Sequence, residues 1–545
     1  MKSDMTDSIC ATATPVGNGG ISVIRVSGPR AVEIAEKVVR CRRGNLAEMA
    51  SHRVKFVEFV AEEAGDSAFA GAAASGEVLD EGVVTLFRAP HSYTGEDVVE
   101  LSCHASPYIV RRLLSALTAA GARMAEPGEF TKRAFLNGRM DLSQAEAVAD
   151  LIAAENKASH DLAWRQLRGG VSSEMAALRA RLVEFASLVE LELDFSEEDV
   201  EFADRSALRT LLDEIAARVA TLRRSFATGL ALKEGVPVVL IGRPNAGKST
   251  LLNRLLHEEK ALVSEIPGTT RDTIEDVWEW EGVRYRFIDT AGLRESTDPL
   301  ELAGMARTKE KMRRSRLWLY LFDASEMSAE AARAEASSWY QDVMGGGDAA
   351  DGVSPSAPVG SPEIGSPELQ ILLVGNKCDK LTASSLANAV GGESGASDVT
   401  YLSASGNVKD SQGVLGADSV SEIAASGLKH TSIGLSGAAG GTLDILYLSA
   451  KTGQGMDVLE SRIKARCGLR LSENETILTN ARHAEVLGRL AETLNRILSG
   501  LTANLSGDLL AQDIREALRY IGEITGEVHP DELLGTIFSR FCIGK

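Results

Sequence analysis

The stretch from Gly242 to Thr250, which reads GRPNAGKST, limits the possible folds of this chain more than any other. It follows the apolar run Val238–Ile241 and precedes a helical stretch, so it fits the strand, turn and helix of a phosphate-binding P-loop. Gly242 and Gly247 let backbone N–H groups turn toward an anion, and the helix N-terminus adds its positive dipole end. The alternative is a plain glycine turn between a core strand and a helix.

Three further nucleotide motifs follow, and they decide against a plain turn. Asp289–Gly292 comes after a strand-like run, where an aspartate can hold magnesium through water. Asn376–Asp379 reads NKCD, and the Asp379 carboxylate can accept two hydrogen bonds from guanine that adenine cannot supply. Ser449–Lys451 would complete the base pocket. Four motifs in this order, each at the end of a predicted strand, predict an inserted α/β GTPase domain of the P-loop, Ras-like type.

The residues of these motifs have distinct expected roles. Lys248 would reach the outer phosphates, and the Ser249 hydroxyl would sit on magnesium. A second stretch, Leu402–Ser405, resembles the last motif, but Ser449–Lys451 has the lysine and an apolar run before it. The motif residues that we expect to bind GTP are Asn245, Ala246, Gly247, Lys248, Ser249, Thr250, Asp289, Thr290, Ala291, Gly292, Asn376, Lys377, Asp379, Ser449, Ala450 and Lys451.

Length and composition set the bounds around this domain. A chain of 545 residues with 44% hydrophobic residues is expected to hold several domains with real cores. The formal net charge of -19 argues against a protein that coats nucleic acid, although a local basic face can still bind RNA. Six cysteines lie far apart without a C-x-x-C pair, which favours free thiols in a reducing compartment.

The N-terminus and the hydropathy pattern bear on localisation. Met1–Ser8 is polar and acidic, unlike a signal peptide. No apolar run approaches the roughly 20 residues that a membrane helix needs. We therefore expect a soluble cytoplasmic protein without membrane contact.

The chain outside the GTPase motifs divides into regions of different periodicity and composition. Residues 1–138 contain the strand-like runs Ile21–Val26, Val83–Phe87 and Val98–Cys103 and the helix-like run Pro107–Ala120, which predicts a mixed α/β domain. The pattern then becomes helical over Leu142–Val219. The acidic run 194–201 in that region suits a solvated helix end better than a metal site.

Helical periodicity returns after the GTPase motifs, at Ala481–Leu498 and Ile514–Ile524. We therefore predict a multidomain chain with a discontinuous all-α domain, whose two parts pack into one bundle around the inserted GTPase domain. Two stretches rich in Gly and Ser, about 344–367 and 382–441, are predicted as solvated insertions. The predicted domains are 1–138, 139–233, 234–461 and 462–545.

Several longer motifs point to one family. They are GGISVIRVSG at Gly19–Gly28, SYTGEDVVE at Ser92–Glu100, PGEFTKRAFLNGRMDL at Pro127–Leu142 and FCIGK at Phe541–Lys545. On these motifs the chain resembles the MnmE (TrmE) family of tRNA-modifying GTPases, within the TrmE-Era-EngA-like GTPases. The resemblance covers Ser8–Lys545 except for the two insertions.

The resemblance implies a reaction and its participants. Members of the family work as homodimers with the flavoprotein MnmG (GidA), in a heterotetramer, to add a carboxymethylaminomethyl or aminomethyl group to carbon 5 of the wobble uridine of certain tRNAs. The one-carbon unit comes from a tetrahydrofolate derivative, in the 5,10-methylene or 5-formyl form.

The resemblance also assigns the folate contacts to Arg25, Glu100, Arg139 and Lys545. Cations suit the carboxylates of folate, and Glu100 suits the donor edge of the pterin ring. Arg139 stands where relatives often carry lysine. Without the family, an ion pair on a strand surface is the preferred interpretation of Arg25 and Glu100.

The mechanism of hydrolysis must differ from that of Ras-like enzymes, because Leu293 stands where they carry a water-orienting glutamine. The resemblance implies that potassium supplies extra positive charge and that Glu301 orients water; a plain surface glutamate is the alternative. Potassium would be held by Asn245, Ser264, Ile266 and Thr269, and magnesium by Ser249 and Thr270. The expected GTP-binding residues of this further loop are Ser264, Glu265, Ile266, Pro267, Gly268, Thr269 and Thr270.

Two features and two other protein classes stay open. Cys542 could act as a nucleophile, but a packing role is at least as well supported. The basic segment Arg307–Arg316 could touch tRNA or a partner, although a charged helix face is the commoner explanation. The competing class is a regulatory GTPase switch in ribosome assembly or a stress response. A scaffold with a degenerate GTPase is disfavoured because the four nucleotide motifs are intact.

Overall fold

The structure is a computed structural model. It describes residues 6–15, 17, 19–61, 77–194, 205–258, 275–280, 282–289, 309–313, 315, 317–344, 369–381, 399–402, 408–411, 431–436, 442–467, 476–503, 505, 507–528, 531–539, 541 and 544. The chain forms two compact units: the first holds residues 1–153, 163–219 and 485–545, and the second holds 154–162 and 220–484.

The first unit begins with an α/β domain. Its described strands form a seven-stranded sheet in the order β3-β4-β5-β6-β2-β1-β7, antiparallel except for the parallel pair β1 and β7. The strands are β1 Ser8–Thr12, β2 Ile21–Ser27, β3 Val39–Cys41, β4 Arg53–Ala61, β5 Glu77–Phe87, β6 Val98–His104 and β7 Ala122–Met124. The strand-like runs predicted from the sequence lie in β2, β5 and β6.

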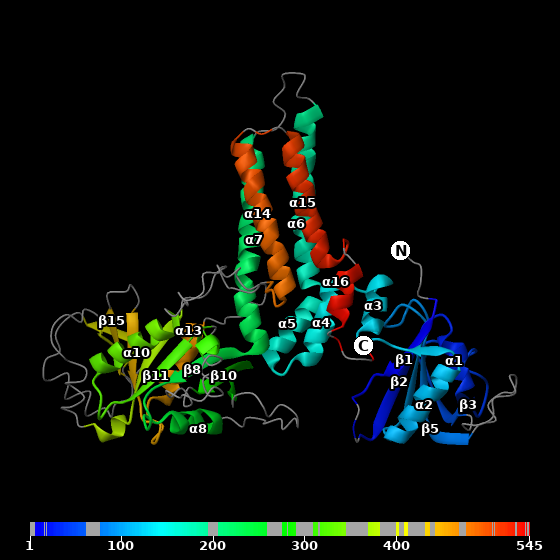
Figure 1. The fold of residues 1–545 in the computed structure, drawn as a ribbon, viewed down its shortest axis with the longest axis horizontal. Helices are drawn as coiled ribbons and strands as arrows, with labels where there is room; N and C mark the ends of the chain where they lie inside the picture. The colour runs from blue at the N-terminus through cyan, green and yellow to red at the C-terminus, as the bar shows by residue number, and fades with distance from the viewer. Residues whose placement is uncertain are drawn as a thin grey trace, which may run out of the picture. The chain divides into compact units, whose positions relative to one another are not determined.

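The two faces of this sheet differ. Helices α1 (Ala31–Lys37) and α2 (Pro107–Ala119) cover one face (Figure 1). Ile24 and Val26 of β2 belong to the continuous apolar core on this face. On the other face, α3 (Glu129–Leu136) covers β1 through the ring of Phe130. Successive strand residues point to opposite faces, so Ile21 of β2 lies away from the helices.

The helical part of the first unit is assembled from distant segments. It contains α4 Leu142–Ala153, α6 Gly170–Asp194, α15 Gly507–Thr525, α16 Asp531–Phe538 and parts of α5 Lys157–Leu167, α7 Arg205–Glu234 and α14 Ala481–Thr502. Helix α15 packs along α6 (Figure 1). Ion pairs join α6 to α7 through Glu174 and Arg218, and α14 to α15 through Arg489 and Glu523. Segments before and after the GTPase domain therefore share one bundle.

Helix α16 returns the end of the chain to the α/β domain. Leu534 and Phe538 of α16 pack in one apolar cluster with Leu142 and Ala145 of α4. Gly128, just before α3, has φ +68°, and a Cβ there would lie 2.6 Å from the carbonyl oxygen of Phe538. Only glycine tolerates both the left-handed backbone and this close approach.

The second unit is built on the GTPase sheet. Its parallel strands are β10 Val283–Asp289, β8 Val236–Ile241, β11 Leu317–Asp323, β12 Gln370–Asn376 and β16 Thr442–Tyr447, in that spatial order, with β9 Glu275–Trp280 antiparallel at one edge. Apolar clusters fill both faces, beneath α8 Lys248–Glu258 and α13 Met456–Cys467 on one and α10 Ala329–Met344 on the other. The predicted fold class, a multidomain chain with α/β, helical and GTPase parts, is confirmed.

One insertion differs from its prediction. Within 382–441, three strands extend the sheet: β13 Val399–Leu402, β14 Val408–Ser411 and β15 Thr431–Ser436, with β15 antiparallel to β16. The apolar residues of β15 alternate along the sequence, and the edge of β16 supplies backbone hydrogen-bonding groups for such a strand. A wholly solvated loop is thus wrong for these residues. The other insertion, 345–367, and the acidic run 195–201 lie outside the described residues, and the predicted domain boundaries stay a prediction.

Candidate functional site

The P-loop joins β8 to α8 and depends on its two glycines. A Cβ on Gly242 would lie 2.0 Å from the carbonyl oxygen of Leu321, and one on Gly247 would lie 2.2 Å from Nδ2 of Asn376; both residues have positive φ. Helix α8 starts at Lys248, so its N-terminal N–H groups point at the loop. The Lys248 ammonium donates hydrogen bonds to the carbonyls of Gly242 and Arg243, at 2.6 and 3.2 Å.

Asn376 connects three of the predicted nucleotide loops. Its Nδ2 donates to the carbonyl of Ala246 in the P-loop at 2.9 Å, and its Oδ1 accepts from the N–H of Ala450 at 2.9 Å. The side chain is buried, with 2% exposed. Parallel strands bring these loops together, because β8, β12 and β16 all end at the same edge of the sheet.

Asp379 is held in place by the last motif. The hydroxyl of Ser449, which is fully buried, donates to Asp379 Oδ1 at 2.6 Å. Lys377, two residues earlier, makes an ion pair with Asp323 at the end of β11. The structure thus brings together the P-loop, Asn376–Asp379 and Ser449–Ala450. Asp323 was missed by the sequence reasoning.

Other predicted site residues lie wholly or partly outside the described residues. Asp289 ends β10, next to the P-loop strand β8, but its side chain is not described. The predicted GTP-binding and catalytic residues that lie outside the described residues are Thr290, Ala291, Gly292, Glu301 and the loop Ser264, Glu265, Ile266, Pro267, Gly268, Thr269 and Thr270.

Arg25 and Glu100 meet on the sheet face of the α/β domain that faces away from α1 and α2. They are opposite each other in the β2–β6 register, and Arg25 Nε and Nη2 donate to Glu100 Oε1 at 3.0 and 2.7 Å. The Arg25 guanidinium also lies 5.3 Å from the ring centroid of Tyr93 and 5.7 Å from that of Phe130. The ion pair considered in the sequence analysis is therefore present, beside two aromatic rings.

A third predicted folate residue, Arg139, lies close to the loop that carries Tyr93. Gly95, two residues after Tyr93, is packed so closely on Arg139 that a Cβ would lie 3.2 Å from Arg139 Cγ. Lys545 is outside the described residues, but a Cβ on its neighbour Gly544 would lie 2.0 Å from the carbonyl oxygen of Thr12, at the end of β1.

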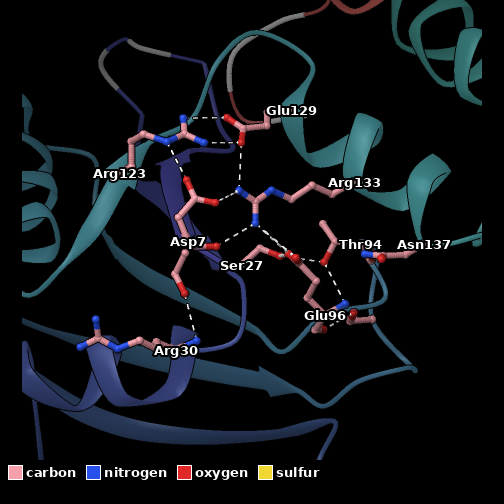
Figure 2. A network of polar contacts seen from close by, with 11 residues as sticks. Asp7, Ser27, Arg30, Thr94, Glu96, Arg123, Glu129, Arg133 and Asn137 are labelled. Atoms are coloured by element: carbon pink, nitrogen blue, oxygen red, sulfur yellow. Dashed lines mark hydrogen bonds and ion pairs between the residues drawn. The ribbon is translucent and has the colours of Figure 1, made fainter. Parts of the chain in front are cut away.

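A buried polar network supports the loop that carries Tyr93 (Figure 2). The guanidinium of Arg133, with 1% of the side chain exposed, donates to Asp7, Glu96 and Glu129. Burial acts to raise the pKa of Glu129, but hydrogen bonds from Arg123 and other groups outweigh it and hold the pKa below its usual value. A buried cation is tolerated here because carboxylates surround it.

This network also reaches the loop directly. Ser27 Oγ donates to Glu96 at 2.7 Å and shares a hydrogen bond of 2.7 Å with Thr94, and Asn137 donates to the Thr94 carbonyl at 2.8 Å (Figure 2). The sequence reasoning missed the network. Only the i, i+4 spacing of Glu129 and Arg133 hinted at it, because Asp7 and Glu96 are far away in sequence.

The remaining predictions concern the basic segment and the cysteines. Lys309 pairs with Asp342, and Arg313 donates to the carbonyl of Val343, so these residues of the basic segment contact α10. The described cysteines are free, and burial raises the pKa of Cys10 to about 11. Cys542 lies outside the described residues. Among the residues described, no cluster of His, Cys, Asp and Glu could hold a metal ion, and no helix is long and apolar enough to cross a membrane.

Comparison with known proteins decides the family. Residues 142–542 match the family model described as the MnmE helical domain, and residues 8–139 match GTP-binding protein TrmE N-terminus. The chain belongs to the MnmE family of tRNA modification GTPases. As a member of this GTPase family it is a GTP hydrolase, as the four motifs predicted.

Two relatives of the MnmE family match nearly the whole chain. The tRNA modification GTPase MnmE of Cytophaga hutchinsonii is 44% identical over 541 residues, which are 99% of this chain and 98% of that protein. The protein of the same name from Christiangramia forsetii is 42% identical over 99% of this chain and 100% of its own length. Among solved structures, an Era variant from Aquifex aeolicus bound to GDP and aluminium fluoride is 19% identical over 47% of this chain and 66% of that chain, with a TM-score of 0.23. This structural likeness therefore plays no part in the assignment of the family.

Proposed function

We propose that this GTPase works in the cytoplasm with the flavoprotein MnmG (GidA), and modifies carbon 5 of the wobble uridine of certain tRNAs. The added group is of the carboxymethylaminomethyl or aminomethyl type, and its one-carbon unit comes from a tetrahydrofolate derivative. The proposal is supported by relatives named for tRNA modification that align over nearly all of this chain. The observation that carries the folate step is the Arg25–Glu100 pair beside two aromatic rings.

The chemistry of this region fits a folate. The side chains of Arg25 and Glu100 are 17% and 25% exposed, so both are partly shielded from water and still accessible to a ligand. The Glu100 carboxylate suits the N–H donors of a pterin ring, and the rings of Tyr93 and Phe130 provide flat apolar surface. Arg139 and Lys545 would bind the glutamate carboxylates of the folate.

The open face of the same sheet suits a second copy of the chain. Ile21, Val54 and Phe56 are 67%, 64% and 49% exposed. Cross-strand pairing places Val83 of β5 between Phe56 of β4 and Ser102 of β6 on this face. Exposed apolar side chains gathered on one sheet face are typical of a protein interface. We therefore propose that the homodimer forms through it, and that two copies join MnmG in a heterotetramer.

Hydrolysis is proposed to use two cations. The described P-loop fits a nucleoside triphosphate. Its two glycines carry no side chains, so the turn has room for the phosphates. Ser249 and Thr270 would hold magnesium, and potassium would lie among Asn245, Ser264, Ile266 and Thr269. These ions offset the charge that develops on the phosphates. Glu301 would orient the attacking water, and Lys248 would bind the outer phosphates.

GTP hydrolysis in potassium and in sodium tests this mechanism. We expect strong stimulation by potassium, loss of that stimulation on dilution of the protein, and a large loss of turnover in Glu301→Ala. Glu326→Ala, which removes an exposed glutamate in the turn after β11, serves as the matched control and should hydrolyse GTP normally. Equal, slow turnover in both salts would contradict the mechanism and favour a regulatory GTP switch.

Folate binding tests the other half of the proposal. Equilibrium dialysis with 5-formyltetrahydrofolate should show binding to the wild type, and at least tenfold weaker binding to Arg25→Ala and Glu100→Gln, because each loses charged hydrogen bonds. Arg30→Ala, which removes an exposed arginine just before α1, is the control. Wild-type protein that does not bind folate would remove the folate step from the proposal.

A further inference from the structure

The carboxylate of Asp323 sits at the end of β11, directly beside the guanine-recognition loop. Asp323 and Asn376 are partners in the β11–β12 register, and Asp323 is only 8% exposed. Its Oδ2 accepts a hydrogen bond from the Lys377 ammonium at 2.7 Å. Its Oδ1 accepts from the N–H and the hydroxyl of Ser325, at 3.0 and 2.6 Å. The two oxygens therefore serve two different neighbours.

Lys377 occupies a demanding position in that loop. It follows Asn376, which is bonded to the P-loop, and it precedes Asp379, which the last motif holds in place. Its backbone has φ +63°, in the left-handed region that side-chain-bearing residues rarely adopt. The direction of a long, flexible lysine is not determined by such a turn, so a fixed partner for its ammonium is needed to hold the stem in one place.

We propose that Asp323 is a positioning residue for purine nucleotides: its carboxylate holds the Lys377 ammonium, so that the lysine stem forms a fixed wall of the base pocket. Asp323 need not touch the nucleotide. Its effect passes through Lys377, while Asp379 reads the exocyclic amine of guanine. The assignment adds a fifth site, at the end of β11, to the four motifs seen in the sequence.

The electrostatics of Asp323 support this role. Burial acts to raise its pKa, but the hydrogen bonds from Lys377 and Ser325 outweigh burial and hold the pKa below its usual value. The carboxylate is therefore ionised near neutral pH. Hydrogen bonds between two charged groups are shorter and stronger than neutral ones, which suits a contact that must position a flexible side chain.

A purely structural role is the competing explanation, because the Ser325 bonds also close the turn after β11. The two oxygens allow the explanations to be separated. Asp323→Asn keeps an acceptor for Ser325 and replaces the other oxygen with an NH₂ group, which cannot accept from an ammonium. Ser325→Ala does the reverse, since it removes a bond of the turn and keeps the carboxylate for Lys377.

The experiment measures the affinity of the full-length protein for GDP and for inosine diphosphate (IDP), by displacement of a fluorescent GDP analogue. Asp323→Asn should bind both nucleotides about tenfold more weakly, because a charged hydrogen bond is lost. The ratio of the two affinities should not change, since GDP and IDP differ only in the amine that Asp379 reads. In a Lys377→Met background, Asp323→Asn should cause no further loss.

The controls separate positioning from folding and from net charge. Asp342→Asn removes the same charge from the exposed pair with Lys309 and should bind GDP normally. Ser325→Ala should also bind normally. The proposal is overturned if Asp323→Asn binds GDP like the wild type, if Ser325→Ala loses as much affinity, if the GDP/IDP ratio shifts, or if the loss persists in Lys377→Met.

Discussion

The buried charges of the α/β domain and the charged groups of the nucleotide loops differ in their bonding partners. Arg133 is 1% exposed, and three carboxylates converge on it. Lys248 instead donates to the backbone carbonyls of its own P-loop. The first set is a network of opposite charges that are paired within the domain. The second set makes local bonds that a phosphate can replace at little cost. Substitutions in the two regions should therefore damage different properties.

The largest effect is expected at Lys248. Lys248→Ala should lower kcat/KM for GTP hydrolysis by about 10²–10³-fold, because the charge on the outer phosphates loses its cation. Thermal unfolding should change little, since the described hydrogen bonds of Lys248 go to backbone carbonyls. A phosphate-release assay measures the rate. Lys309→Ala removes an equal charge from an ion pair elsewhere in the domain and is the control. Normal hydrolysis by Lys248→Ala would erase the contrast between the two regions.

Arg133→Met should show the opposite pattern. It removes the buried cation that Glu96 and Glu129 share and leaves Glu129 with Arg123 alone, which is expected to cost about 3 kcal/mol of stability. Hydrogen exchange of β1 and α3 measures this locally. Arg30→Met, which breaks an exposed pair with Glu33, should cost far less, because water and salt screen such a pair. Similar costs for the two variants would show that the network is not a cooperative support.

The stability of the α/β domain should also depend on pH, with a smaller effect than that of Arg133→Met. Because the folded pKa of Glu129 lies below its ordinary value of 4.5, the network contributes fully above that pH. Its contribution should disappear as the pH falls through the lowered folded pKa. Chemical unfolding measured between neutral pH and acid should show this loss in the wild type and a weaker one in Glu129→Gln. Identical acid profiles would argue that Glu129 gains nothing from its arginines.

Ser449→Ala should have the smallest effect. It removes the hydroxyl that holds Asp379 at 2.6 Å, so GDP binding is expected to weaken about fivefold, the usual value of one hydrogen bond. Fluorescent nucleotide displacement measures the affinity. Ser461→Ala removes an exposed helical serine whose hydroxyl donates to the carbonyl of Asp457 in the same helix, and should have no effect on binding. An unchanged affinity in Ser449→Ala would mean that Asp379 is positioned by other contacts.

The same contrast explains what the sequence could predict. The P-loop and the NKCD motif are short and continuous, so residues such as Lys248 and Asp379 were found from spacing alone. The network around Arg133 joins Asp7, Glu96 and Glu129 across the domain, and no local pattern specifies such pairing. Asp323 could not be predicted for a related reason. The register of β11 against β12 brings it to Lys377, and the sequence of one strand does not specify that register.

The most direct test is a reconstituted reaction with the flavoprotein partner, tRNA, GTP and a tetrahydrofolate, followed by mass spectrometry of the tRNA nucleosides. The wild type should produce a uridine modified at carbon 5. Lys248→Ala should produce little because its GTP hydrolysis is slowed, and Arg25→Ala should produce little although it hydrolyses GTP at the normal rate. Full product from Arg25→Ala would contradict the division of labour between the two regions.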